Sequence, residues 1–220
     1  MAKGAAQGRH EARAIPAAQD GAAPAAVQQR PELTLPQAEA ALVRATYDQA
    51  GVILEYGSGG STVMAAEMPG KTVFSVESDH GWLTMMEGWF AANPPASTVR
   101  MHHGDIGPTG AWGRPADETT FRKWPGYALS VWDRPDFVQP DVVLIDGRFR
   151  AACLMTVALR TTRPVTVLFD DYTERKPYHT VETLLPRAGT VGRMVRFEVA
   201  PMALPPERLQ WLVGLYQRPL

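Results

Sequence analysis

The amino-acid sequence predicts an α/β fold: a doubly wound, seven-stranded and mostly parallel sheet with helices on both faces, in three layers. Three observations support this prediction. From about residue 50 onward, short apolar runs typical of strands alternate with longer segments of helical spacing. The central runs are continuously apolar, as expected for strands that are covered on both faces. The last two strand-like runs, residues 193–199 and 209–216, are joined only by a proline-rich turn, which predicts an antiparallel pair.

The apolar runs and helical segments can be placed in order along the chain. Parallel strands are predicted at residues 52–54, 73–76, 97–103, 141–145 and 165–169, and helices between them at residues 81–92 and 151–160. An earlier helix is expected to begin at Thr34, because Thr34 and Gln37 have the spacing of a capping box and Pro36 lies in the first turn. Its predicted buried face consists of Ala38, Ala41, Leu42 and Ala45, and Gly51 is its predicted C-terminal cap.

The first 33 residues differ in composition from the rest of the chain. Residues 1–33 are mostly Ala, Gln, Gly and Pro with scattered charges, and they lack the continuous apolar core of a secretory signal. This composition predicts a flexible arm. Residues 34–220 are long enough to form one domain with a sizeable core.

Composition and charge exclude several functional classes. Of the 220 residues, 45% are hydrophobic and 20% are charged, as in soluble globular proteins. The net charge of −1 argues against nucleic-acid binding, which needs a clustered positive field. The single cysteine, Cys153, excludes an intrachain disulfide and a cysteine-based zinc cluster. No apolar run approaches the ~18 residues that cross a bilayer, so we expect a cytoplasmic protein with no membrane partner.

A glycine-rich turn, here called the glycine loop, follows the first strand. Residues 57–62 read Gly-Ser-Gly-Gly-Ser-Thr. Gly57 and Gly59 allow the backbone to turn tightly and to approach a ligand without a Cβ in the way. Ser61 or Thr62 can then cap the helix that follows. A strand, a glycine loop and a helix start are the order that a nucleotide-binding loop requires.

Acidic residues end the strands beside this loop. Glu77 closes the second strand and follows Glu55 at the spacing from which a carboxylate can bind both ribose hydroxyls. The third strand ends in residues 104–106, Gly-Asp-Ile, where Asp105 can receive the exocyclic amine of adenine. One such carboxylate alone is commonly a solvated loop charge. Their succession at strand ends favours a ligand site, because open α/β sheets bind ligands at the carboxyl ends of their strands.

The glycine loop, Glu77 and residues 104–105 resemble the motif series of class I S-adenosylmethionine-dependent methyltransferases, whose sheet is Rossmann-like. The resemblance covers about residues 50–216. It implies that S-adenosylmethionine is the cofactor and that it is bound by Glu55, Tyr56, Gly57, Ser58, Gly59, Ser61, Thr62, Glu77, Ser78, Asp105, Ile106 and Asp146. Glu55 and Gly57 are expected near the methionine moiety. Glu77 is expected on the ribose, and Asp105 and Ile106 on the adenine.

A second acidic group ends the fourth and fifth strands. Asp146 closes the fourth strand, and Asp170 and Asp171 close the fifth. Neighbouring strands lie ~4.8 Å apart, so these carboxylates converge at one edge. Three carboxylates repel one another unless something positive lies among them, and Mg²⁺ or another hard divalent cation is a suitable partner. The arrangement resembles that of metal-dependent O-methyltransferases.

The candidate catalytic residues are Asp146, Tyr172 and His179. A metal on the acceptor hydroxyl would lower its pKa and fix its direction. The chain departs from the resemblance at Phe149, where related enzymes often carry a His or Lys ligand or base. Arg148 and Arg150 lie nearby, without an assigned role.

A long segment between Asp105 and Asp141 is rich in Gly, Pro and aromatic residues. A loop of this length is usually functional or disordered. Its aromatic residues argue for order and predict a lid over the acceptor: Trp112, Trp124, Tyr127 and Trp132. Its basic residues, Arg114, Arg122 and Lys123, would suit an anionic acceptor, although a solvated face is the commoner role for such residues.

Together these features predict an S-adenosylmethionine-dependent methyltransferase that acts on oxygen in a small-molecule acceptor, with a divalent metal as an optional assistant. A homodimer is compatible with this prediction. Two alternatives remain open at this point. One is a catalytically silent relative that binds the cofactor as a sensing or assembly module. The other is a different nucleotide-dependent enzyme of the NAD type, disfavoured because Thr62 stands where a dehydrogenase has its third glycine.

Overall fold

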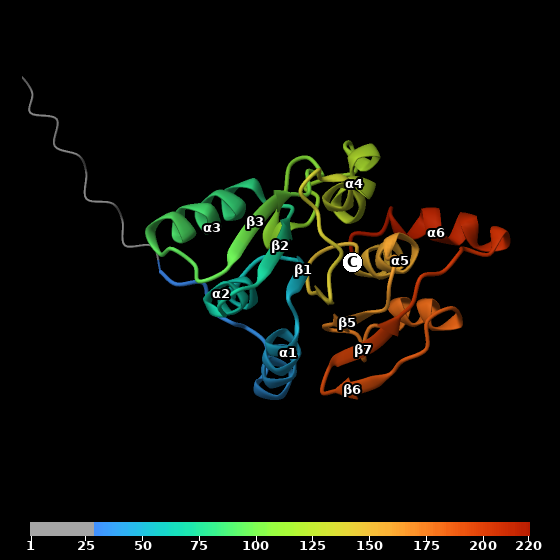
Figure 1. The fold of residues 1–220 in the computed structure, drawn as a ribbon. Coiled ribbons are helices and arrows are strands. Elements are labelled where there is room, and N and C mark those ends of the chain that lie inside the picture. Colours follow the sequence, from blue (N-terminus) through green and yellow to red (C-terminus); the bar gives the residue numbers. More distant parts are fainter. Residues whose placement is uncertain (1–28) are drawn as a thin grey trace, which may run out of the picture.

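Within residues 29–220, which the computed structural model describes, seven strands form one sheet: β1 (Val52–Tyr56), β2 (Thr72–Glu77), β3 (Thr98–His103), β4 (Val142–Ile145), β5 (Val165–Phe169), β6 (Gly189–Val191) and β7 (Met194–Val199). Their order is β3-β2-β1-β4-β5-β7-β6 (Figure 1). Strands β1 to β5 pair in parallel, whereas β7 pairs antiparallel with β5 and β6. The predicted sheet is confirmed. Most of the predicted arm lies outside the described residues.

Helices cover both faces of this sheet (Figure 1). In the described part of the chain they are α1 (Gln37–Gln49), α2 (Gly60–Glu67), α3 (His80–Ala92), α4 (Pro125–Leu129), α5 (Arg150–Arg160) and α6 (Leu209–Leu215). Helices α1, α2 and α3 lie on one side of the sheet, and α4, α5 and α6 on the other. None of these helices is long and apolar enough to span a membrane.

The central strands bury side chains on both of their faces. In β4, Val143 and Ile145 pack into the core that contains α5, whereas Val142 and Leu144 pack into the core that contains α1 and α2. Side chains alternate between the two faces of a strand, so a strand buried on both faces must be apolar throughout. This requirement explains why the continuous apolar runs located the parallel strands.

Helix α1 begins later and buries a different face than predicted. It starts at Gln37 after Pro36, without a side-chain cap, so the predicted capping box is wrong. The buried positions are Glu39, Val43 and Tyr47, while Ala38, Ala41 and Ala45 are exposed. The apolar pattern predicts the wrong face because two of the residues on the buried face of α1, Glu39 and Tyr47, carry polar groups. Glu39 accepts a hydrogen bond from the Arg193 backbone N at 2.9 Å, and the Tyr47 hydroxyl donates to Glu55 at 2.6 Å.

One strand of the predicted antiparallel pair, residues 193–199, is confirmed as β7, but its predicted partner, residues 209–216, is wrong. Residues 209–215 are helix α6, and the partner of β7 is the short strand β6, joined through Gly192 and Arg193. Gly192 has φ +53°, a conformation that glycine adopts without strain. In α6, Leu212 and Leu215 are buried one helical turn apart. Segment 209–216 was mistaken for a strand because its aromatic and branched residues also suit one.

Candidate active site

The carboxyl ends of the central strands open onto one cavity of about 1360 Å³. Strand β1 lies between β2 and β4 at the point where the strand order reverses, which is where open α/β sheets bind ligands. Pockets for a single small molecule usually have volumes of ~300–1,000 Å³, so this cavity has room for a cofactor and a second ligand. Its main lining segments are residues 29–35, 57–61, 77–79, 109–114 and 146–148.

The glycine loop lines the cavity, and close backbone contacts require two of its glycines, Gly57 and Gly60. Gly57 has φ +103°, and a Cβ there would lie 2.7 Å from the Gly147 backbone N. The turns after β1 and β4 therefore touch. A Cβ on Gly60 would overlap the backbone at residues 32–33, so the segment before α1 crosses directly over the start of α2.

Helix α2 is capped differently than predicted. It begins at Gly60 with Gly59 as the N-cap residue, so neither Ser61 nor Thr62 occupies the N-cap position. Instead, the Thr62 hydroxyl accepts a hydrogen bond from the Gly59 backbone N at 3.0 Å and donates to Glu55. Ser58 and Ser61 line the cavity beside these glycines.

Glu77 reaches the cavity from the end of β2. Its Oε1 accepts from the backbone N atoms of Ser78 and Asp79 at 2.7 and 2.9 Å, and its Oε2 accepts from the Ser58 backbone N at 3.2 Å. Burial raises the pKa of Glu77, and these donors oppose the shift. Backbone donors thus fix the carboxylate, and Oε2 has one described partner. Glu77 and Ser78 both line the cavity, as their predicted role requires.

Glu55 and Tyr56 lie behind the glycine loop rather than in the cavity. Both are fully buried. Burial raises the pKa of Glu55 to about 7, although hydrogen bonds from Thr62 and Tyr47 act in the opposite direction. The Tyr56 hydroxyl donates to the Ala128 carbonyl at 2.7 Å. The geometry therefore makes them supports of the loop and argues against direct contact with a ligand.

Asp105 and Ile106 do not line the cavity either. The Asp105 carboxylate accepts from Lys123 Nζ and from the Gly107 backbone N, both at 2.8 Å, on the exposed surface. Ile106 is fully buried in the core. The geometry therefore argues against a direct contact of Asp105 or Ile106 with adenine.

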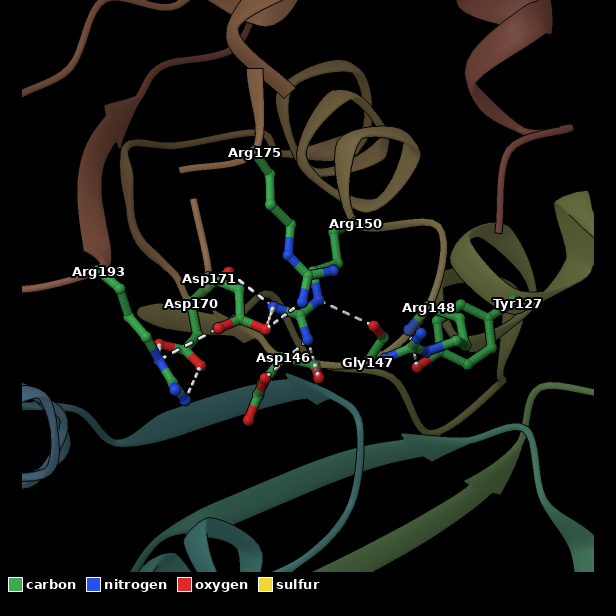
Figure 2. A network of polar contacts seen from close by, with 9 residues as sticks. All are labelled: Tyr127, Asp146, Gly147, Arg148, Arg150, Asp170, Asp171, Arg175 and Arg193. Atoms are coloured by element: carbon green, nitrogen blue, oxygen red, sulfur yellow. Dashed lines mark hydrogen bonds and ion pairs between the residues drawn. The ribbon is translucent and has the colours of Figure 1, made fainter. Parts of the chain in front are cut away.

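The acids that end β4 and β5 do converge. Asp146, Asp170 and Asp171 each offer an oxygen within 4.8 Å of the others. Figure 2 shows, however, that guanidinium groups lie among them, and we call the whole set the acid–arginine cluster (Asp146, Asp170, Asp171, Arg150, Arg175 and Arg193).

Arg150 is the centre of this cluster. It is buried, and its Nη2 and Nη1 pair with Asp146 at 3.0 Å and Asp171 at 3.3 Å. The same guanidinium donates to the carbonyls of residues 146, 147 and 170 at 2.7–2.9 Å, which ties the turn after β4 to the turn after β5. Arg175 pairs with Asp171 at 2.7 Å, and Arg193 with Asp170 at 2.7 Å.

These contacts do not fit a divalent metal. The positive charge that the three carboxylates require is supplied by three guanidinium groups, and a metal would have to displace hydrogen bonds from buried partners. Phe149, at the position where a further ligand was considered, packs its ring against Trp124 and Tyr127 in the apolar core. We therefore assign no metal to this group.

Of the predicted catalytic residues, Asp146 alone lines the cavity. Its side chain is 30% exposed. Burial raises the pKa of Asp146, and Asp170 and Asp171 add to this shift while Arg150 opposes it. Tyr172 is fully buried, and its hydroxyl donates to Glu182 at 2.9 Å. His179 stacks on the Tyr172 ring, so neither residue is placed to touch a ligand.

Several cavity residues were not assigned a role from the sequence. Trp82 lines the cavity, and its Nε1 donates to the Ser58 carbonyl at 2.9 Å, which holds the glycine loop from α3. Among the predicted lid aromatics, Trp112 and Tyr127 line the cavity, Trp112 being 85% exposed and Tyr127 buried, while Trp124 and Trp132 are core residues. The sequence pattern of α3 does not indicate that Trp82 faces the cavity.

Comparison with known proteins finds solved structures that are similar to this chain. A methyltransferase-like protein from Silicibacter pomeroyi DSS-3 superposes with a TM-score of 0.84 and 52% sequence identity, over 86% of this chain and 99% of that chain. No protein-family model and no curated protein matches the chain.

More distant structures share the fold. The O-methyltransferase TomG from Streptomyces achromogenes, involved in tomaymycin synthesis and solved in complex with S-adenosylmethionine, has a TM-score of 0.52 and 18% identity over 78% of this chain and 82% of that one. A methyltransferase from Geobacter sulfurreducens has a TM-score of 0.50 and 12% identity over 76% and 80%.

Proposed function

The chain belongs to the class I S-adenosylmethionine-dependent methyltransferases, and from this premise we propose that it methylates an oxygen atom of a small-molecule acceptor. The observation that carries the proposal is the cavity at the switch point of the sheet. It combines the glycine loop, a fixed carboxylate at Glu77 and room for a second ligand. TomG, an O-methyltransferase with the same fold, supports the choice of oxygen.

The residues around the glycine loop fit the cofactor. Backbone at Gly57 and Gly59 approaches the cavity without side chains, which suits close contact with the methionine moiety. The Glu77 carboxylate is held by backbone donors and keeps lone pairs for the ribose hydroxyls. Trp82 and Trp112 flank this part of the cavity with aromatic surface.

Asp146 is the proposed catalytic base. When bound, the cofactor supplies a methyl group on a positively charged sulfur. Methyl transfer forms the bond from the acceptor oxygen to the methyl carbon as the carbon–sulfur bond breaks, and the hydroxyl proton passes to the Asp146 carboxylate. The raised pKa of Asp146 is closer to the pKa of the acceptor hydroxyl, which favours proton transfer to this carboxylate. The ion pair with Arg150 holds Asp146 in place. No step is assigned to a metal.

A small molecule is the proposed acceptor rather than nucleic acid or a membrane-bound partner. The net charge of −1 does not favour phosphate backbones. The cavity is also bordered by residues 29–35 on one side and residues 109–114 on another, which limits the size of the acceptor.

Calorimetry and a methyl-transfer assay test this proposal. We expect S-adenosylmethionine and S-adenosylhomocysteine to bind, and NAD and ATP not to bind. We also expect radiolabelled methyl to pass to an oxygen of at least one compound in a panel of hydroxylated small molecules. Binding of NAD in place of both sulfur ligands would overturn the proposal. Binding of the sulfur ligands without transfer to any acceptor would favour a silent, sensing relative.

A further inference from the structure

Arg148 is a buried cation without a described partner. It follows Asp146 and Gly147 after β4, lines the cavity and is 8% exposed. Its Nε and Nη1 atoms are buried and donate to no group in the described part of the chain. The other cavity arginines after β4 and β5 differ in this respect, because Arg150, Arg175 and Arg193 all pair with carboxylates.

The backbone around Arg148 is fixed. Its backbone N donates to the Tyr127 hydroxyl at 3.2 Å, a contact drawn in Figure 2, and its carbonyl accepts from Cys153 Sγ at 3.4 Å. The next residue, Phe149, is buried against Trp124 and Tyr127. The backbone that carries the Arg148 side chain is therefore held in place beside the cavity.

A buried guanidinium group without described partners, such as that of Arg148, is stabilised by an anion that binds to it. A guanidinium stays charged in proteins, and burying it without partners costs free energy. Burial is the main cause that lowers the pKa of Arg148, and the charges of Arg150 and Arg114 act in the same direction. Arg114 also lines the cavity, and among the described residues it forms no ion pair. Two unpaired arginines thus border the same space.

We propose that Arg148, together with Arg114, binds a carboxylate or phosphate group of the methyl acceptor. Arg148 follows β4, on the opposite side of β1 from Glu77, whereas Arg114 follows Gly113, whose carbonyl accepts a hydrogen bond from the Ser78 hydroxyl beside Glu77. The proposed site therefore lies where the cofactor half of the cavity, next to Glu77, meets the half that faces the acid–arginine cluster. The planar guanidinium fork matches both kinds of anion. This inference rests on the proposed function and names the chemical class of its acceptor.

Anion titration of the cofactor-loaded protein tests the inference. The chain is saturated with S-adenosylhomocysteine, so that the cofactor half is occupied, and is titrated with inorganic phosphate or with acetate in separate calorimetry arms. We expect saturable binding in at least one arm, and the arm that binds tells phosphate from carboxylate. Arg148→Gln is expected to weaken that binding by about tenfold or more, since it removes charge-assisted hydrogen bonds.

Two further variants keep the test decisive. Arg114→Gln changes an exposed residue, and we expect it to weaken anion binding by several-fold even if Arg148→Gln folds poorly. Arg122→Gln removes an exposed arginine that does not line the cavity, and it should bind the anion as the wild type does.

The outcomes separate this inference from the proposed function. Failure of the wild type to bind S-adenosylhomocysteine would contradict the proposed function itself. Normal binding of S-adenosylhomocysteine with no anion binding, or with equal anion binding by all variants, would overturn the inference alone. A loss of S-adenosylhomocysteine affinity in a folded Arg148→Gln variant, with anion binding intact, would place Arg148 on the cofactor and would also overturn it.

Discussion

Arg193 donates from Nε and Nη2 to the two carboxylate oxygens of Asp170, at 3.0 and 2.7 Å. Asp170 is fully buried, whereas the Arg193 side chain is 39% exposed. The pair joins the end of β5 to the turn between β6 and β7. It also engages both oxygens of Asp170, the most buried acid in the acid–arginine cluster, so this carboxylate is not available to a ligand, whereas Asp146 lines the cavity.

Removing Arg193 should destabilise the fold. Arg193→Gln leaves the Asp170 carboxylate buried without its bidentate partner, and we expect a loss of about 2–4 kcal/mol in the free energy of unfolding. Urea denaturation measures it. The matched control is Arg196→Gln in the adjoining strand β7, because Arg196 and Glu198 form an exposed pair whose loss should cost less than about 1 kcal/mol. Equal losses in the two variants would contradict the structural role of the Asp170–Arg193 pair.

Magnesium should have no effect on the wild-type protein. Because guanidinium groups already engage the three carboxylates, adding Mg²⁺ should not raise the melting temperature, and a chelator should not slow methyl transfer. Arg150→Gln serves as the positive control, since it removes the ion pair of Asp146 and one of the ion pairs of Asp171, and should create Mg²⁺-dependent stabilisation. Activity of the wild type that disappears with chelator and returns with Mg²⁺ would show that the arginines move aside for a metal.

Glu77 and Asp105 provide a paired test of where the cofactor lies. Glu77→Gln should weaken S-adenosylhomocysteine binding by about 1–3 kcal/mol, because a charged acceptor at the cavity wall is lost. Asp105→Asn should leave the affinity unchanged, because that carboxylate pairs with Lys123 on the surface. Calorimetry on both variants decides the matter. A comparable loss in Asp105→Asn would restore its predicted contact with adenine.

The parts of the fold that follow from local pattern could be predicted, and the parts that depend on distant partners could not. Strand β5 was located at 165–169 because a strand covered on both faces is apolar throughout. The buried face of α1 was missed because Tyr47 is buried for its hydrogen bond to Glu55 on β1, a contact that the helical apolar pattern does not contain.

The candidate site shows the same division. Glu77 was identified from its position at a strand end, which fixes its place on the cavity. The convergence of Asp146, Asp170 and Asp171 was also predicted, but not the identity of the positive charge among them. Arg193 reaches Asp170 from a hairpin 23 residues further along the chain, and no local spacing encodes such a pair.

Glu55 should make stability depend on pH. Its pKa is about 7 in the folded protein against 4.5 as the ordinary value, with burial as the main cause. The folded state therefore holds this proton more tightly than the unfolded state. The resulting stability is fully present below about pH 4.5 and is lost as the pH rises through about 7. This difference between the folded and the ordinary pKa of Glu55 corresponds to about 3 kcal/mol in the free energy of unfolding.

Glu55→Gln isolates this contribution, because glutamine cannot ionise and approximates the protonated acid. Urea denaturation of both proteins at pH 5 and pH 8 should show the variant gaining stability relative to the wild type as the pH rises. Asp146 is present in both proteins, so most of its own contribution to the pH dependence cancels in this difference. Glu207→Gln, an exposed control, should follow the wild-type curve at both pH values. Parallel curves for Glu55→Gln and the wild type would mean that the buried carboxyl is ionised at pH 5, held by its hydrogen bonds from Tyr47 and Thr62.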